Sequence, residues 1–428
     1  MNLSRTTTTA FVVLLVLGAC NPPRPRPGRP PQGAEGGFGG SRSDLVSGLG
    51  GAAFKPKSPS TSCTQPSSKT LSVTKKNLLR STGECAQLRY CEFELAAEQL
   101  AHDARAYVES PSDSRLTELQ QTLTLSLQTW ARAELFRFGP AAGSAQDMEN
   151  GKGLRDLIYS WPNVSRCRVE EQLFGQAYQE KGFDDLVSVP INSRGLFAVE
   201  YLSFYDAADN DCTAFSITNA DDAWNQLSSD ELVERKHSYL RAVSDDVFVR
   251  AQALVSAWAA NEGNFQESYE NSAGYMSQQE ALNLTAHSLL YVELEVKDFK
   301  IGSPAELYES APLERPEASF SKGGTLLIAQ NLRGFRDLFQ GCNGQGLGFD
   351  DLLEAANHKD LADDIVAALD EAQEAVEHFP DLADAKRSEL EELHAVIKQL
   401  TDLLKSEFFG QGSPLGFTLP SAVEGDTD

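Results

Sequence analysis

Apolar residues recur every three or four positions from about residue 70 onward. This spacing is the period of an amphipathic helix, and the alternating runs typical of strands are scarce. Long helices joined by short polar connectors favour up-and-down bundles. We therefore predict an all-α fold of two antiparallel up-and-down helical bundles packed together. The clearest helical segments are ELAAEQLAHDARAYV, LTELQQTLTLSLQTWARAELFRF, ELVERKHSYLRAVSDDVFVRAQALVSAWAA and DIVAALDEAQEAVEHF.

One further helix is predicted over 385–408, near the C-terminus. Its apolar residues form a single stripe, which predicts the buried face. We place the boundary between the two bundles before Ser229, because Ser229 followed by Glu231 is typical of a helix start. The bundles are thus predicted over 69–228 and 229–428. The stripe consists of Leu390, Leu393, Ile397, Leu400 and Leu404.

The N-terminal residues predict export and a lipid anchor. A lone Arg5 precedes an apolar run that is too short to span a bilayer and is typical of a secretory signal. The run ends in LGAC, which resembles the bacterial lipobox, so 1–19 is the predicted lipoprotein signal peptide and Cys20 the predicted lipidation site. The alternative is an ordinary signal peptide with a chance cysteine. Residues 20–68, rich in Pro, Gly and Ser, are predicted to form a disordered stalk.

The charge of the chain limits its partners. The 428 residues include 37 Lys and Arg against 62 Asp and Glu, a net charge of −25. Nucleic-acid binding needs a basic surface, so no nucleic-acid partner is expected. The predicted partners are the membrane, through the lipid anchor, and a small-molecule or metal ligand. The predicted location is the bacterial cell envelope, as a periplasm-facing or surface lipoprotein.

Six cysteines remain after Cys20, an even number that favours disulfides in an exported protein. None of them forms a CxxC pair, so a zinc knuckle is not expected. Sequence alone leaves 15 pairings open. We favour Cys167–Cys212, because the two residues flank the segment 194–202 and each lies in or beside a predicted loop.

Other clusters of ligand-type residues carry weaker signals. Two Glu-x-x-His pairs occur, at Glu234 and Glu391, and such pairs build di-iron sites in some bundles. Both glutamates lie off the predicted apolar stripes, which favours solvent-exposed faces. Asp206, Asp209 and Asp211 crowd one loop but lack the glycine and glutamate of an EF-hand, which leaves only an irregular calcium site as an alternative.

The segment RGLFAVEYL, residues 194–202, places one carboxylate in an apolar run. Phe197 and Glu200 lie one turn apart on the same face of a helix. A histidine at position 197 would form a metal clamp with Glu200, but phenylalanine cannot ligate a metal. A buried glutamate must still be paired or protonated, and Arg194 at the helix entrance is the nearby cation.

This segment resembles the imelysin family, whose motif is Gly-x-His-x-x-Glu. Gly195 and Glu200 match the motif, and Phe197 stands in place of the histidine, as in one branch of the family. Two further segments, TWARAELFRFGPAAG and LIAQNLRGFRDLFQG followed by GQGLGFDDLL, are similar to family segments, as is the C-terminal LGFTLPSAVEGDTD. The resemblance covers roughly 70–425. The matching residues are Trp130, Ala133, Glu134, Gly139, Pro140, Ala141, Asn331, Gly334, Gly341, Gly346, Gly348, Phe349 and Asp350.

The resemblance implies two packed helical bundles with the motif helix facing a cleft between them. The family includes proteins described as insulin-cleaving metallopeptidases and as iron-regulated periplasmic proteins. The residues implied to line the cleft are Glu200, Glu134, Arg194 and Gly195. Glu200 and Glu134 are also the metal-ligand candidates. The alternative is that both carboxylates only satisfy buried partners.

Two functions remain open on this basis, and a structural envelope protein that binds no small ligand is the third alternative. The first is a non-catalytic metal- or ligand-binding lipoprotein linked to iron acquisition, with no catalytic residues. The second is a metallopeptidase that uses Glu200 with ligands from elsewhere in the chain. The missing histidine favours the first, because a metal-activated water needs several fixed ligands. The cofactor stays open, with a divalent cation or iron as the candidate.

The predicted anchor is tested by Cys20→Ser. Stable attachment needs more than one acyl chain, which a lipidated cysteine supplies. The variant is expected to appear in the soluble fraction of a bacterial host that processes lipoproteins, whereas the wild type stays with the membrane. Persistence of the variant in membranes after a high-salt wash would show that another feature anchors the chain.

Overall fold

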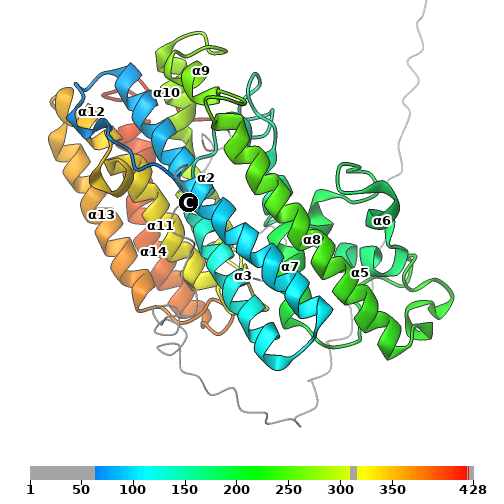
Figure 1. The fold of residues 1–428 in the computed structure, drawn as a ribbon. Helices are drawn as coiled ribbons and strands as arrows, with labels where there is room; N and C mark the ends of the chain where they lie inside the picture. The colour runs from blue at the N-terminus through cyan, green and yellow to red at the C-terminus, as the bar shows by residue number, and fades with distance from the viewer. Residues whose placement is uncertain (1–62, 309–315, 422, 424–428) are drawn as a thin grey trace, which may run out of the picture. The chain divides into compact units, whose positions relative to one another are not determined.

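The computed structural model describes residues 63–308, 316–421 and 423, which lie within one compact unit, Ala52–Asp428. Within these residues the regular elements are all helices, so the predicted all-α fold is confirmed (Figure 1). The predicted signal peptide, Cys20 and most of the predicted stalk lie outside the described residues. The division into two bundles at 228/229 stays a prediction. No helix in the described part combines the length and apolar character needed to span a bilayer.

One group of helices forms around α2 (Lys75–Glu109), the longest helix described. It packs against α3 (Asp113–Ala133) and α8 (Ser229–Trp258) (Figure 1). The short helix α7 (Gly195–Phe204), which carries the RGLFAVEYL segment, packs against α3 and α8. Nearly all of α7 is buried, as its apolar sequence requires.

A second group of helices comes from the C-terminal half. The π-helix η7 (Val292–Gly302) packs against α11 (Gly324–Gln340) and α14 (Arg387–Leu403). Helix α13 (Lys359–Glu377) packs against α11 and α14 (Figure 1). Because α11 also packs against α3, the two groups share a contact through these helices. The C-terminal helix η9 spans Leu404–Phe408.

Short helical elements complete the described chain. They are η1 (Ser68–Thr70), η2 (Gly139–Ala141), α4 (Leu154–Ile158), α5 (Arg166–Gly175), α6 (Ala177–Lys181), η3 (Ile191–Ser193), η4 (Ala220–Asp222), η5 (Trp224–Gln226), α9 (Phe265–Glu270), α10 (Gln278–His287), η6 (Ser288–Leu290), η8 (Cys342–Gly344) and α12 (Phe349–Ala355).

The start of α8 corrects one sequence prediction. Ser228, rather than Ser229, is the N-cap residue, and its hydroxyl accepts a hydrogen bond from the Glu231 amide at 3.3 Å. The Glu231 carboxylate in turn accepts the Ser228 amide at 2.9 Å, which completes a capping box. A capping box needs a spacing of three residues, and Ser229 lies only two before Glu231.

The predicted stripe of the last helix is confirmed. All five of its residues are buried, on α14 and the first residue of η9. The two Glu-x-x-His glutamates are exposed, as their helical phase predicts. Glu391 forms an exposed ion pair with Arg387 at 2.9 Å, so neither pair builds a buried metal site.

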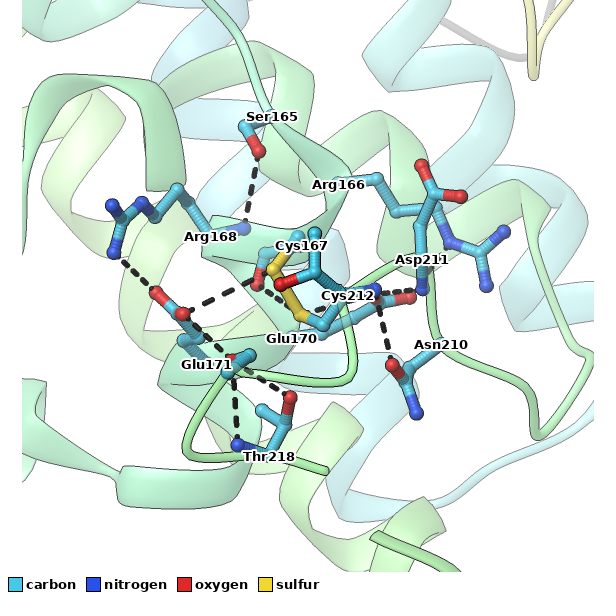
Figure 2. The surroundings of a disulfide bond; sticks show 12 residues. Ser165, Arg166, Cys167, Arg168, Glu170, Glu171, Asn210, Asp211, Cys212 and Thr218 are labelled. Carbon is cyan, nitrogen blue, oxygen red and sulfur yellow. Dashed lines mark hydrogen bonds and ion pairs between the residues drawn. A yellow bond between two sulfur atoms is a disulfide. The ribbon is translucent and has the colours of Figure 1, made fainter. Parts of the chain in front are cut away.

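Three disulfides link the described residues, and the predicted Cys167–Cys212 bond is one of them (Figure 2). It joins α5 to the loop that follows α7. Cys63–Cys91 fastens the start of the described chain to α2, although 63–68 belongs to the predicted stalk. Cys85–Cys342 connects α2 to the loop after α11, across 257 residues.

Removal of Cys85–Cys342 by replacing both cysteines with alanine should lower the free energy of unfolding by about 2–5 kcal/mol. The bond closes a long loop, so its loss raises the conformational entropy of the unfolded chain. In the folded protein the bond also fixes the contact between α2 and the loop after α11. Chemical denaturation of the oxidised proteins measures the effect. The double variant lacking Cys63–Cys91, which closes 28 residues, serves as the comparison and should lose less. Equal losses would contradict the loop-length argument.

Candidate functional site

Helix α7 begins at a glycine that its position requires. Gly195 has φ +70°, in the left-handed region that favours glycine. A Cβ built there would lie 2.3 Å from the carbonyl oxygen of Ile158, so any side chain would displace α4. Gly195 therefore sets the close approach of α7 to α4.

Phe197 and Glu200 both meet the segment 316–323, as their one-turn spacing predicts. The Glu200 carboxylate accepts hydrogen bonds at Oε1 from the Ser321 amide at 2.9 Å and the Ser321 hydroxyl at 2.8 Å. The Phe197 ring packs against the Phe320 ring, with centroids 6.2 Å apart. At the position where the family motif has a metal-binding imidazole, this chain makes an aromatic contact.

The second oxygen of Glu200 has no hydrogen-bond partner among the described residues, and it is buried. Burial raises the pKa of Glu200 to about 7, and the nearby Glu317 carboxylate raises it further, against the Ser321 hydrogen bonds that lower it. Glu200 therefore titrates near neutral pH. One of its oxygens is fixed by Ser321, and the other is free to carry the proton.

Glu134, at the C-terminal end of α3, lies in a second buried polar group. Its Oε1 accepts hydrogen bonds from the Tyr291 hydroxyl at 2.7 Å and the Asn331 amide at 3.0 Å. The Lys300 ammonium lies 3.5 Å from the same oxygen. Its Oε2 lies 3.6 Å from the Arg155 guanidinium. Elements far apart in sequence thus converge on one carboxylate.

Lys300 is the centre of this group. Its ammonium is fully buried and lies 2.8 Å from Oε2 of Glu317, while it donates to the Asn331 side-chain oxygen at 2.7 Å. The rings of Trp161 and Tyr291 lie 5.5 and 5.4 Å from the ammonium, within cation–π range. Lys300 therefore occupies the place between two carboxylates that a bound cation would otherwise take.

The two carboxylates beside Lys300 titrate differently. Burial opposes ionisation of Glu134, but the charges of Lys300 and Arg155 outweigh it, so the pKa of Glu134 is lowered. Burial raises the pKa of Glu317 to about 7, and the Glu134 charge adds to the rise, although Lys300 lowers it. The surroundings therefore favour the ionised form of Glu134 and the protonated form of Glu317.

Tyr159, directly after α4, links Glu200 to this group. Its hydroxyl is buried and has no hydrogen-bond partner in the described part of the chain. Burial raises the pKa of Tyr159 well above its usual value, and the charges of Glu317, Glu200 and Glu134 raise it further. Because the charges of these three carboxylates all act on the Tyr159 phenol, we group Glu134, Glu200 and Glu317 with Lys300, Arg155 and Tyr159 as the Glu200 cluster.

Arg194, predicted to line the same cleft, is committed elsewhere. Its guanidinium binds the Asp246 carboxylate on α8 and the carbonyl oxygen of Phe183, and it lies over the Phe183 ring with 5.0 Å to the centroid. The structure therefore brings Glu134 and Glu200 into one cluster and places the contacts of Arg194 on the α8 side of α7.

The Glu200 cluster does not fit a resident metal ion. Carboxylate and phenol oxygens suit a hard cation. Among the described residues, three side chains of metal-binding type place their possible ligand atoms within 4.8 Å of one another. They are Cys167, Glu171 and Cys212, which lie outside the Glu200 cluster. Those two sulfurs form a disulfide and offer no thiolate (Figure 2). The Glu200 cluster instead neutralises its carboxylates with Lys300, Arg155 and protons.

The aspartate loop is likewise engaged by protein groups. Asp209 pairs with Arg166 at 3.0 Å, and the Asp211 amide donates to Glu170 at 2.7 Å. Figure 2 shows Arg166, Glu170 and Asp211 gathered beside the disulfide. These contacts hold the loop against α5 through the Asp209 carboxylate and the Asp211 backbone.

Sequence reasoning found Glu134 and Glu200 but missed most of their neighbours, because the local sequence pattern does not mark those residues as buried. In the segment VELEVKDFK, for example, the charges fall on every side of the helix, which a buried π-helix can accommodate. The missed residues are Tyr159, Arg155, Tyr291, Lys300 and Glu317.

The fold and the buried cluster on α3 and α7 define an imelysin-type helical protein. The family model described as Imelysin matches residues 86–406, about three quarters of the chain. The chain therefore belongs to the imelysin family, as its motif residues predict. No curated protein matches the sequence.

Two solved structures share the fold. An imelysin-like protein from Psychrobacter arcticum 273-4 has a TM-score of 0.56 and 19% identity, covering 82% of this chain and 98% of that one. A protein from Parabacteroides distasonis ATCC 8503, provisionally named iron-regulated protein A precursor, has a TM-score of 0.57 and 16% identity, covering 78% and 95%. At these identities the likeness extends to the fold alone.

Glu200→Gln should remove a pH dependence of stability. Because the pKa of Glu200 is raised to about 7 in the folded protein, the folded state holds a proton that the unfolded state releases. The wild type therefore loses stability as pH rises from about 4.5 to about 7, on the order of 3 kcal/mol from this group. Glutamine keeps the acceptor for Ser321 without the charge, so the variant should lose less between pH 5 and pH 8.

Chemical denaturation at both pH values gives this difference. Glu234→Gln, at an exposed position on α8, is the matched control and should follow the wild type. Parallel curves for Glu200→Gln and the wild type would mean that Glu200 is ionised in the folded protein at both pH values.

Lys300→Met should destabilise the protein by about 3–5 kcal/mol at pH 8, because it leaves Glu134 and Glu317 as buried carboxylates without their shared cation. Adding Glu317→Gln to the same chain should recover part of the loss. Lys398→Met, which breaks an exposed pair with Asp402 at 2.8 Å, should cost less than about 1 kcal/mol. A similar cost for both lysines would contradict the central role of Lys300.

Proposed function

We propose that this chain is a non-catalytic binding lipoprotein of the bacterial cell envelope that serves iron acquisition. In this proposal the Glu200 cluster holds α3, α7, η7 and the segment 316–323 in their binding-competent arrangement. It supplies no metal-activated water. The contact between Phe197 and Phe320 carries the proposal, because it fills the position from which an imidazole would bind a metal.

The chemistry of the cluster supports a non-catalytic role. A hydrolytic metal site needs several ligands, an open position and a water whose pKa the ion lowers. Here Ser321 holds one oxygen of Glu200 through two hydrogen bonds. Lys300 stands between the other two carboxylates. The motif glutamate is thus used to fasten a loop.

The disulfides and the N-terminal sequence support the envelope location. Three disulfides among the described residues suit an oxidising compartment outside the cytoplasm. The LGAC sequence at Cys20 supplies a lipidation site for attachment to a membrane. A lipid-anchored body in the periplasm or on the surface follows from the two features together.

The link to iron rests on the family. A structural relative from Parabacteroides distasonis carries the provisional name iron-regulated protein A precursor. In the proposed role, loss of the gene lowers iron uptake when iron is scarce, and the protein acts by binding.

A pair of substitutions at one position tests the non-catalytic role. In a native-host strain that lacks the gene, Glu200→Gln should restore growth under iron limitation, because glutamine still accepts the hydrogen bonds of Ser321. Glu200→Ala removes that acceptor and should restore growth less well. A metallopeptidase that needs the Glu200 carboxylate would lose its function in both variants.

Purified protein provides the direct assay. Unfolded protein substrates incubated with the wild type and added zinc or iron should stay intact. Metal-dependent cleavage that Glu200→Gln abolishes would establish the metallopeptidase alternative. Normal growth and iron uptake of the deletion strain under iron limitation would remove the iron role, whatever the result of the cleavage assay.

A further inference from the structure

A second site lies away from the Glu200 cluster, where α11 ends and the chain turns toward α12. A depression of about 410 Å³ opens there, next to η1 and the end of α3. Its charged lining residues are Lys69, Arg132, Arg333, Arg336, Asp337 and Asp350. A depression of this size suits a small molecule.

The charge of this depression is opposite to that of the chain. Four cationic side chains line it against two carboxylates. In the whole chain, acidic residues outnumber basic ones by 62 to 37. Cations gathered in a concave surface attract anions, and the surrounding negative charge repels large polyanions such as nucleic acids. The local inversion therefore favours a small anion.

The two carboxylates of the lining differ in their partners. Asp337 accepts two hydrogen bonds from Arg132, at 2.6 and 2.9 Å, and one from the buried Arg89 at 3.0 Å. Asp350 accepts a hydrogen bond from the Asp351 amide at 2.8 Å, and burial raises its pKa to about 6, with the Asp351 charge adding to the rise. Asp337 is therefore already paired, and Asp350 is the lining carboxylate whose negative charge opposes an anion at neutral pH.

Arg333 is the cation that the fold leaves unused. It is exposed on α11, and it has no hydrogen bond or ion pair to any other described residue. Arg336 lies one turn further on the same helix, where it binds Gln340, Asp370 and Gln373. Two like charges at this spacing disfavour a helix slightly. Within the part of the chain that the structure describes, Arg333 thus makes no hydrogen bond or ion pair that stabilises the fold. An anion bound between Arg333 and Arg336 would offset the repulsion between their positive charges.

The floor of the depression is rigid before any ligand arrives. The Cys85–Cys342 disulfide fastens its loop to α2. Arg89, also on α2, donates to the Asn343 side-chain oxygen at 2.7 Å, and Arg132 donates to the same oxygen at 3.0 Å. The Asn343 amide donates to Asp337 at 3.2 Å. A site held in this way loses little entropy on binding.

We propose that this arginine-lined depression binds a small multivalent oxyanion, either phosphate or a polycarboxylate. Arg333 makes the principal contact, whereas Lys69 and Arg336 beside it are already paired with Asp351 and Asp370. A planar guanidinium presents paired N–H donors that match two oxygens of a phosphate or a carboxylate. The site does not depend on the Glu200 cluster or on the iron role.

Titration calorimetry of the purified full-length chain tests the proposal, with inorganic phosphate and citrate as probes at constant ionic strength. At least one probe should bind saturably with one site per chain. Arg333→Gln should weaken that binding about tenfold or more, because it removes the charge-assisted hydrogen bonds of the principal contact. The two probes separate phosphate recognition from carboxylate recognition.

Arg241→Gln is the matched control. Arg241 is also an exposed arginine without a partner among the described residues, but it lies on α8. This variant has the same net charge as Arg333→Gln and should bind as the wild type does. Circular dichroism confirms that both variants are folded. Equal affinities for the two variants, or no saturable binding of either probe to the wild type, would overturn the proposal.

Discussion

The buried ammonium of Lys300 is the interaction on which the centre of the molecule depends. It stands between Glu134 at the end of α3 and Glu317 just before α11, while its own backbone belongs to η7. An unpaired buried charge is costly, so each of these elements must keep its place for the others to remain neutralised. These ion pairs thus fix the positions of α3, η7 and the segment before α11 relative to one another more strictly than non-directional apolar packing does.

The proposed non-catalytic role rests on the same arrangement. A protein cation between two carboxylates is permanent, whereas a metal ion exchanges and can hold a water molecule. Glu200 and Glu317, whose pKa values are raised to about 7, bind or release protons near neutral pH. The net charge of the Glu200 cluster therefore changes with the pH of its surroundings near neutrality.

The sequence predicts the helices well because their signals are local. The stripe from Leu390 to Leu404 follows from spacing alone, and so does the shared face of Phe197 and Glu200. The Cys167–Cys212 bond was within reach because both residues flank the segment that contains α7. Even the error at Ser228 is a shift of a single residue within a correct helix start.

The composition of the cluster could not be predicted in this way. Lys300 and Glu317 are ordinary charged residues in sequence, and only the tertiary contacts among η7, α3 and α11 make them buried partners. Arg194 illustrates the opposite case, since its proximity to Glu200 in sequence suggested a contact that it makes with Asp246 instead. Pairing across distant elements depends on side-chain direction, which spacing along the chain does not encode.

In the proposed envelope location, the Cys85–Cys342 bond has a consequence for how the chain matures. The N-terminal half of an exported chain emerges first, so Cys85 must wait as a free thiol until Cys342 follows. During that time Cys63 and Cys91 are its nearest reactive neighbours. Residues six apart in an α-helix point about 120° away from each other. Early formation of α2 therefore keeps Cys85 from bridging to Cys91 and preserves it for its late partner.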